Sequence, residues 1–260
     1  MNAIRRRRVS SASLFTPPQL ANLRLWLAAD SGVFSDTALT TPQSTDGGGV
    51  GGWKDKGPFA NNATQGTGAR QPLLKTSGLN GHPTVLFATA SSQWMSADAI
   101  ATSVTGSNLP CTVIAVCKPV STATQVFFAF ADGILPSQNW FFYISGTPVW
   151  ACSKHDDTTH STVVSGGTPD TNAHIVSWVG PGTTLTINVD GAVVLNAGGQ
   201  TQAPTTLNTA TIGAINSNAV QSSFLNSHIA EIFVWSAALS AGEQAGVRAA
   251  MAKKYAISSS

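Results

Sequence analysis

Residues 228–257 read HIAEIFVWSAALSAGEQAGVRAAMAKKYAI, and this stretch contains two kinds of predicted secondary structure. The run 229–235 is rich in β-branched and aromatic residues, as strands are. Ser240 and Glu243 then form the Ser-x-x-Glu capping box that begins many helices. Apolar residues follow at helical spacing: Val247, Met251 and Tyr255. The stretch therefore predicts a strand, a short linker and one capped helix at the end of the chain.

Strand signals recur at short intervals before this stretch, from Pro83 onward. The clearest is TLTINVDGAVVL at 184–195, where apolar residues alternate with polar ones around the two-residue turn Asp190-Gly191. Further predicted strands are 23–28, 84–87, 112–118, 126–131, 140–144, 149–152, 174–179 and 209–213. We therefore expect an all-β antiparallel sandwich with a short C-terminal helix.

The order of these motifs resembles the concanavalin A-like, laminin G-like jelly-roll family over roughly residues 23–257. The stretches that carry the resemblance are LWLAADSG (25–32), WKDKGPFANNATQ (53–65), GLNGHPTVLFATASSQWMSA (78–97), HIVSWVGPGTTLTINVDGAVV (174–194), TIGAINS (211–217) and the closing stretch 228–257. The resemblance implies two stacked antiparallel sheets. The chain departs from the family pattern at Asn62, where members often have His, and at Ala88-Thr89-Ala90, which replaces a common Asp-Gly pair.

Charge is unevenly distributed along the chain. Charged residues make up 10% of the sequence, and the net charge is +2. Four positive charges lie together in an N-terminal arm, at Arg5, Arg6, Arg7 and Arg8, so the rest of the chain has a net charge near 2 − 4 = −2. The body is therefore not a basic nucleic-acid platform. We expect a basic arm with a short helical turn over 1–22 and one jelly-roll domain over 23–260.

The sequence gives no strong signal for catalysis. Glycoside hydrolysis needs two paired carboxyl groups, and the chain has only two glutamates, Glu231 and Glu243. Glu243 is explained by the capping box, and we expect Glu231 to be a structural residue on the strand face of Ile229, Phe233 and Trp235. There is no Gly-x-Ser-x-Gly nucleophile elbow either. We expect no catalytic residue and no enzymatic activity.

Two groups of residues could in principle bind a metal ion. His155, Asp156, Asp157 and His160 form the densest cluster, but their spacing matches no tight metal motif, and we expect a polar loop. Calcium prefers oxygen ligands from Asp-rich and Gly-rich loops, which makes Asp30 and Asp55 the candidates. We expect no cofactor, with calcium as the alternative.

Tryptophan supplies the candidate ligand contacts, because flat aromatic rings stack on sugar rings. Trp26, Trp178 and Trp235 lie inside predicted strands and are expected in the core. Four others lie nearer to loops or strand ends and are predicted to bind a glycan: Trp53, Trp94, Trp140 and Trp150.

Residues 9–20, which follow the arginines, are too polar for the apolar core of a signal peptide, so we expect no leader. A lectin-like module without a leader predicts a non-enzymatic structural or binding protein of a phage virion, in the tail, fibre, baseplate or capsid decoration. The basic arm would anchor it to other virion proteins, and the jelly roll would face a host-surface glycan. We expect a homo-oligomer, with a trimer as one option, and neither membrane nor nucleic-acid binding. The alternative is a secreted bacterial carbohydrate-binding domain or a glycoside hydrolase.

Overall fold

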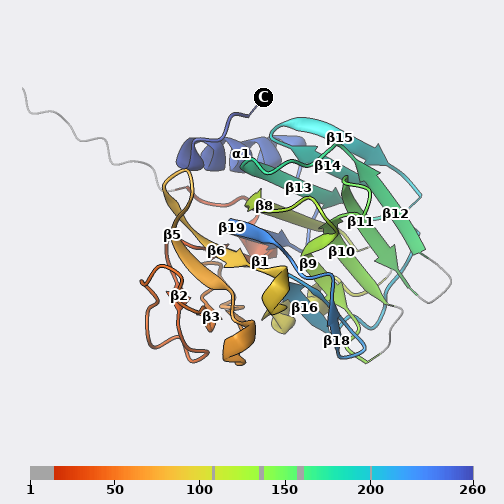
Figure 1. Cartoon of the computed structure of the whole chain (residues 1–260). Helices are drawn as coiled ribbons and strands as arrows, with labels where there is room; N and C mark the ends of the chain where they lie inside the picture. Colours follow the sequence, from red (N-terminus) through yellow and green to blue (C-terminus); the bar gives the residue numbers. More distant parts are fainter. Residues whose placement is uncertain (1–14, 107–108, 135–137, 157–160, 200, 260) are drawn as a thin grey trace, which may run out of the picture.

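The structure is a computed structural model that describes residues 15–106, 109–134, 138–156, 161–199 and 201–259. Two antiparallel sheets form most of it (Figure 1). Sheet A has eight strands: β15 (Ala192–Ala197), β14 (Leu185–Val189), β13 (His174–Gly180), β8 (Cys111–Pro119), β19 (Ser227–Trp235), β6 (His82–Phe87) and β5 (Leu73–Leu79) in spatial order, with β1 (Leu23–Ala28) also paired to β19.

Sheet B has nine strands in the order β12 (Ser161–Gly166), β11 (Trp150–His155), β10 (Asn139–Ile144), β9 (Gln125–Ala131), β16 (Thr209–Ile212), β7 (Met95–Ser96), β4 (Ala63–Thr64), β3 (Gly52–Trp53) and β2 (Val33–Phe34). A separate hairpin joins β17 (Ile215–Ser217) to β18 (Val220–Ser222). The remaining elements are the helix α1 (Ala241–Tyr255) and the 3-10 turns at Leu20–Asn22, Gly68–Arg70, Thr89–Ser91 and Asp98–Ser103. These elements confirm the predicted all-β sandwich with one C-terminal helix.

The main core lies between the two sheets and is strongly aromatic. Its largest side chains come from both sheets and are all buried: Trp53, Trp140, Trp150, Trp178, Phe87, Phe127, Phe128, Phe130 and Phe142. Two of the buried indole N–H groups are hydrogen-bonded to backbone oxygens: Trp53 Nε1 donates to Ala28 O at 3.1 Å, and Trp178 Nε1 donates to Ala151 O at 3.2 Å. Buried rings of this size supply a large share of the hydrophobic stabilisation.

The outer face of sheet A is covered by α1. Val247, Met251 and Tyr255, which were predicted from their spacing, are the buried residues of the helix. They pack against residues of β8, β13 and β19 in a second hydrophobic cluster. Ser240 and Glu243 form the predicted capping box. Figure 1 shows α1 at the top of the molecule, next to the sheet A strands.

The segment before β1 is fixed to the same side of the molecule. Phe15 lies edge-on to Trp26 and to Phe233, with ring centroids 6.1 and 6.3 Å apart. The Trp235 indole donates to Pro18 O at 2.9 Å. The predicted anchoring residues, Arg5 to Arg8, lie outside the described residues.

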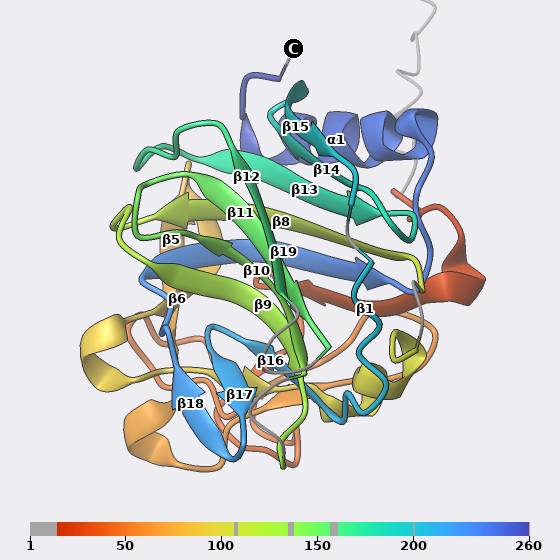
Figure 2. The same cartoon turned by 90° about the vertical axis from the view of Figure 1, so that its right-hand side faces the viewer.

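The outer face of sheet B has a different cover. Of the described elements, it is the hairpin β17–β18 that lies over β9, where Ile215 joins a small cluster with Ala129 and Ala131. The α1 helix packs on the opposite layer, so β10, β11 and β12 face outward (Figure 2).

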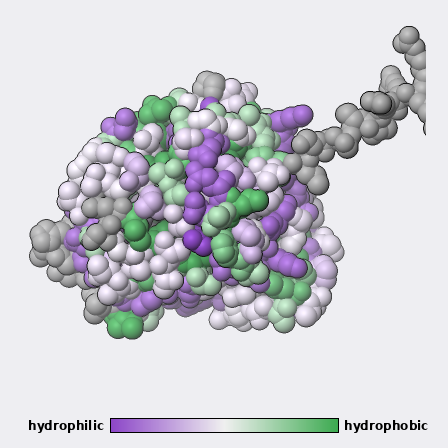
Figure 3. Space-filling model, turned by 180° about the vertical axis from the view of Figure 1, so that it is seen from behind, coloured by the Kyte–Doolittle hydropathy of each residue, from purple (hydrophilic) through white to green (hydrophobic). Residues whose placement is uncertain are grey.

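On the face seen in Figure 3, hydrophobic residues form small separate groups among hydrophilic ones. None of the described helices is long and apolar enough to span a membrane.

Candidate binding surface on sheet B

Strand β10 presents apolar side chains on both of its faces. Trp140 and Phe142 point into the main core. By strand alternation, Asn139, Phe141 and Tyr143 lie on the opposite, outward side. The rings of Phe141 and Tyr143 are 4.8 Å apart between centroids and tilted by 52°. Phe141 is partly exposed, whereas Tyr143 is 9% exposed and packs beside Ile215 of the β17–β18 hairpin. The Phe141 ring, with the Tyr143 hydroxyl beside it, is a candidate contact surface for a ligand.

His155 on the neighbouring strand β11 extends this pair. Its ring stacks on Phe141, with centroids 6.0 Å apart and an interplanar angle of 15°. Its Nε2 atom is hydrogen-bonded to Ser153 Oγ at 2.6 Å. Burial lowers the pKa of His155, which keeps the imidazole neutral near pH 7. We call Asn139, Phe141, Tyr143, Ser153 and His155 the aromatic face.

The side chains around the aromatic face are small. Ala129 and Ala131 on β9 and Ala151 on β11 lie on the same side of the sheet. Val163 on β12 lies opposite Ser153 and is 56% exposed. Small neighbours leave the Phe141 ring accessible from solvent, and the ring is accordingly only partly buried.

Two polar groups of the aromatic face keep free hydrogen-bonding capacity. Asn139 is 8% exposed, and its side-chain oxygen is buried and accepts no hydrogen bond from the described residues. The Tyr143 hydroxyl has no hydrogen-bond partner among the described residues and is not one of their buried polar atoms. Burial raises the pKa of Tyr143, so the hydroxyl stays protonated and can donate. A ligand on the rings could therefore also form hydrogen bonds.

Three of the four tryptophans that were predicted to bind a glycan are buried in the main core. Trp53, Trp140 and Trp150 are 0%, 1% and 1% exposed and belong to the main core, which corrects the prediction for these residues. Their large apolar rings stabilise the fold more when removed from water than when left at a strand end. Trp94 is partly exposed, and its Nε1 atom is buried without a partner in the described part of the chain. For Trp94, glycan contact stays a prediction.

The two calcium candidates have other partners. Asp55 accepts hydrogen bonds from the backbone amides of Trp26, Gly57 and Asn61 at 2.7–2.9 Å, which fixes the loop after β3. Asp30 forms an ion pair with Lys254 at 2.7 Å. Within the described residues, no group of three or more His, Cys, Asp or Glu side chains converges on a common centre. Of the predicted His-Asp cluster, Asp157 and His160 lie outside the described residues.

Glu231 is the centre of a buried network under α1. Its carboxylate accepts hydrogen bonds from Trp26 Nε1 at 2.8 Å, from the Tyr255 hydroxyl at 2.9 Å and from Lys254. The sequence predicts that Ile229 lies on the same strand face as Glu231. This prediction is wrong, because a bulge between Ile229 and Glu231 shifts the strand register and Ile229 points into the main core. The expected structural role of Glu231 agrees with these contacts.

The same network brings two carboxyl groups of the described residues together. Asp30 and Glu231 both contact Lys254 Nζ, beside a pocket of about 280 Å³. However, the Glu231 side chain is 1% exposed, and the lysine holds both carboxylates. Burial opposes ionisation of Asp30, but Lys254 outweighs it and lowers the pKa of Asp30. A hydrolase needs a protonated acid and a free carboxylate, whereas here both carboxylates are paired with the same lysine.

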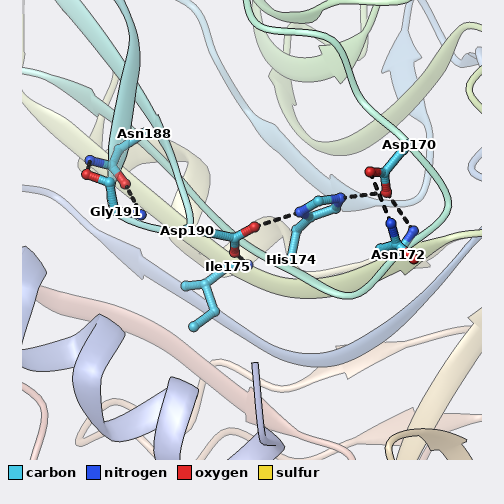
Figure 4. Close-up of polar contacts among 7 residues, drawn as sticks. All are labelled: Asp170, Asn172, His174, Ile175, Asn188, Asp190 and Gly191. Atoms are coloured by element: carbon cyan, nitrogen blue, oxygen red, sulfur yellow. Dashed lines mark hydrogen bonds and ion pairs between the residues drawn. The ribbon is translucent and has the colours of Figure 1, made fainter. Parts of the chain in front are cut away.

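A second polar network connects the predicted hairpin turn to β13 (Figure 4). Asp190 and Gly191 both have positive φ, 52° and 106°, as the two central residues of a type I′ turn require. Asp190 accepts a hydrogen bond from Ile175 N at 2.7 Å. His174 lies between Asp190 and Asp170, with ring nitrogens 2.7 and 2.9 Å from their oxygens. This network fixes the turn and is a structural feature of sheet A.

Comparisons with known proteins agree with this architecture. The NanB sialidase of Streptococcus pneumoniae is similar at a TM-score of 0.51 and 16% identity, over 61% of this chain and 26% of the sialidase. The binding domain of Botulinum neurotoxin DC, solved with rat synaptotagmin II, is similar at a TM-score of 0.58 and 8% identity, over 89% of this chain and 52% of that one. The matches therefore span about a quarter and about half of those chains, and at these identities they show a shared fold.

A search among curated proteins finds no match to the sequence. The model of the concanavalin A-like lectin/glucanases superfamily, in its laminin G-like form, matches residues 90–243, which contain the strands β7 to β19 but not β1 to β6. This is more than half of the chain, and it includes the whole aromatic face. The chain belongs to the concanavalin A-like lectin/glucanase superfamily.

Proposed function

We propose that this protein is a non-catalytic carbohydrate-recognition module that binds a glycan on the aromatic face of sheet B. The observation that carries the proposal is the Phe141–Tyr143 pair, which lies on the outward side of β10 with His155 stacked beside it. Aromatic rings bind ligands through their apolar faces, and Tyr adds a polar group at its edge. A sugar ring has the same combination of apolar C–H faces and hydroxyl edges.

The polar groups of the aromatic face support the same proposal. The buried Asn139 oxygen is an acceptor without a partner in the described residues, and the Tyr143 hydroxyl is a donor. Leaving a buried acceptor unpaired costs about 1–3 kcal/mol. The Asn139 oxygen is closed off from solvent, so a ligand hydroxyl would reach it only after neighbouring side chains moved, and the Tyr143 hydroxyl is the group that would orient a sugar stacked on Phe141.

The lectin function is favoured over the glucanase function by the state of the carboxyl groups. Glu231 is fully buried and already accepts hydrogen bonds from three side chains. Glu243 is used in the capping box and accepts from Gln19. Binding without turnover is therefore the expected behaviour.

The virion assignment remains a prediction. Nothing in the described residues or in the family match bears on a phage origin, and the arginines that would anchor the module lie outside the described residues. A bacterial carbohydrate-binding domain is the simpler form of the proposal, because it needs the aromatic face alone.

The proposal is tested with a glycan array followed by isothermal titration calorimetry on the best ligand. Phe141→Ala and Tyr143→Ala should each weaken binding roughly tenfold, or about 1.4 kcal/mol. Phe59→Ala is the matched control, because Phe59 is a 45% exposed ring on the loop after β3 and should bind normally. Unchanged affinity in both β10 variants would contradict the proposal.

Three further measurements test the alternatives of hydrolysis and self-association. Reducing-sugar assays on bound glycans should detect no turnover, and Glu231→Gln should not alter binding by a folded protein. Sedimentation velocity would reveal whether the aromatic face instead joins two copies of the chain. A dimer that Phe141→Ala dissociates would assign the face to self-association and overturn the proposal.

A further inference from the structure

We propose that the aromatic face selects uncharged oligosaccharides and discriminates against sialylated, sulfated or uronic-acid glycans. This inference rests on the proposed function and adds the class of ligand. It is not the class that the name of the similar sialidase would suggest, and it follows from the charges around the face.

The described outward residues of β9, β10 and β11 are uncharged. They are Val126, Ala129, Ala131, Asn139, Phe141, Tyr143, Ala151, Ser153 and His155, of which His155 is the one titratable group apart from the Tyr143 hydroxyl. The nearby described residues of β12 are Val163 and Ser165. A ligand on this face would therefore contact rings, methyl groups, hydroxyls and one amide.

Two described cations, Lys154 and Arg70, have contacts away from the surface. Lys154 lies between His155 and Ser153 in sequence, but it points into the core, where it is 1% exposed and lies 4.8 Å from the centroid of the Trp140 ring. Arg70 donates to Gln221 on β18 at 3.1 Å, and β17 lies between β18 and β9. Neither cation is placed to meet an acidic group bound on Phe141.

The described acidic residues at this end of the sheet add to the discrimination, since Asp132 follows β9 and Asp156 follows β11 next to His155. Asp132 is 2% exposed, with a carboxylate that accepts hydrogen bonds from Ile134 N and Thr206. Its negative charge would repel a ligand carboxylate or sulfate and leave a neutral sugar unaffected. An acidic sugar would therefore lose hydration on an apolar surface without gaining a cation, while a neutral sugar loses only hydroxyl hydration.

The test compares pairs of glycans with the same core, such as lactose-terminated chains with and without a terminal sialic acid or sulfate, at pH 7.5. The uncharged member of each pair should bind at least about tenfold more tightly, and its affinity should change less than about twofold between low and high salt. An equal or tighter affinity for the acidic member, or a steep loss of affinity with salt, would overturn the inference while the proposed function stands. Absence of binding to every glycan would instead contradict the proposed function.

A gain-of-charge variant gives an independent test. Val163→Arg places a cation on β12 beside Ser153 and should raise the relative affinity for the acidic member of each pair by roughly fivefold or more. Val193→Arg is the matched control, because Val193 is 61% exposed on β15 at the edge of sheet A. An equal change of selectivity in both variants would mean that the charge around the aromatic face does not set the ligand class.

Discussion

The Tyr255 hydroxyl on α1 donates a hydrogen bond of 2.9 Å to the buried Glu231 carboxylate on β19. Trp26 on β1 and Lys254 on α1 donate to the same carboxylate. One acidic side chain therefore connects the helix to two strands of sheet A. These hydrogen bonds give the fully buried Glu231 a structural role, so no catalytic role is needed to explain its presence.

The first prediction concerns the lysine of this network. Lys254→Met should lower the free energy of unfolding by about 2–4 kcal/mol, because it leaves the Glu231 charge buried without its cation. This expected loss of unfolding free energy is smaller than for a fully buried ion pair, since the Lys254 side chain is 28% exposed. Urea denaturation measures the loss. Lys253→Met is the control, because Lys253 is exposed and should change stability by less than about 0.5 kcal/mol. Equal effects of the two substitutions would show that the network is not important for stability.

Lys154 is expected to reduce stability. Its amine is buried in the core without a hydrogen-bond partner in the described residues, and burial lowers its pKa. Lys154→Met should therefore raise the free energy of unfolding, by about 1–3 kcal/mol at neutral pH. The unfolded chain binds more protons than the folded one between the lowered pKa and about 10.4. The wild-type protein should thus gain stability as pH rises through this window, and the variant should lack this gain. A variant less stable than wild type at every pH would mean that the amine makes a favourable interaction in the core.

The His174 network predicts the opposite pH dependence. Burial opposes protonation of His174, but its hydrogen bonds to Asp190 and Asp170 outweigh it and raise the pKa of the imidazole. The stabilisation is therefore fully present below about pH 6.5, the ordinary value for histidine, and is lost as pH rises through the raised pKa. The difference in unfolding free energy between wild type and His174→Gln should shrink from pH 6 to pH 9, and an NMR titration of the ring should give a pKa above 6.5. A constant difference across this range would refute the imidazolium assignment. His82→Gln is the control for the loss of a histidine outside this network, because the His82 ring packs on Tyr255.

The fold was largely predictable because its strands carry strong local signals. The Asp190-Gly191 turn and the Ser240–Glu243 capping box both appear where the sequence predicts them. The sequence predicts no strand at β2, β3, β4 or β7, which have two residues each, because such short pairings depend on tertiary context and have no period of their own. Strand β12 was missed as well, since its segment STVVSG has few large apolar residues.

The candidate site was harder to predict than the fold. Strand β10 reads NWFFYI, and an unbroken apolar run does not show which residues point inward. Tryptophans near strand ends are the candidates that the sequence offers for sugar contact, but Trp140 and Trp150 point into the core. The useful signal was the run itself: in an antiparallel sheet with one solvated face, aromatic residues at both alternating positions imply an outward aromatic surface. Phe141 and Tyr143 could have been found by that argument.

The central claim is that sheet B binds a glycan through its outward aromatic face, and amide NMR mapping with the best array ligand tests it most directly. The largest chemical-shift changes should fall on β10 and β11, around Phe141, Tyr143 and Ser153, with little change in α1 or in the loop that contains Asp55. Shifts concentrated instead around Glu231 and Lys254, or at the turn of Asp190, would contradict the claim.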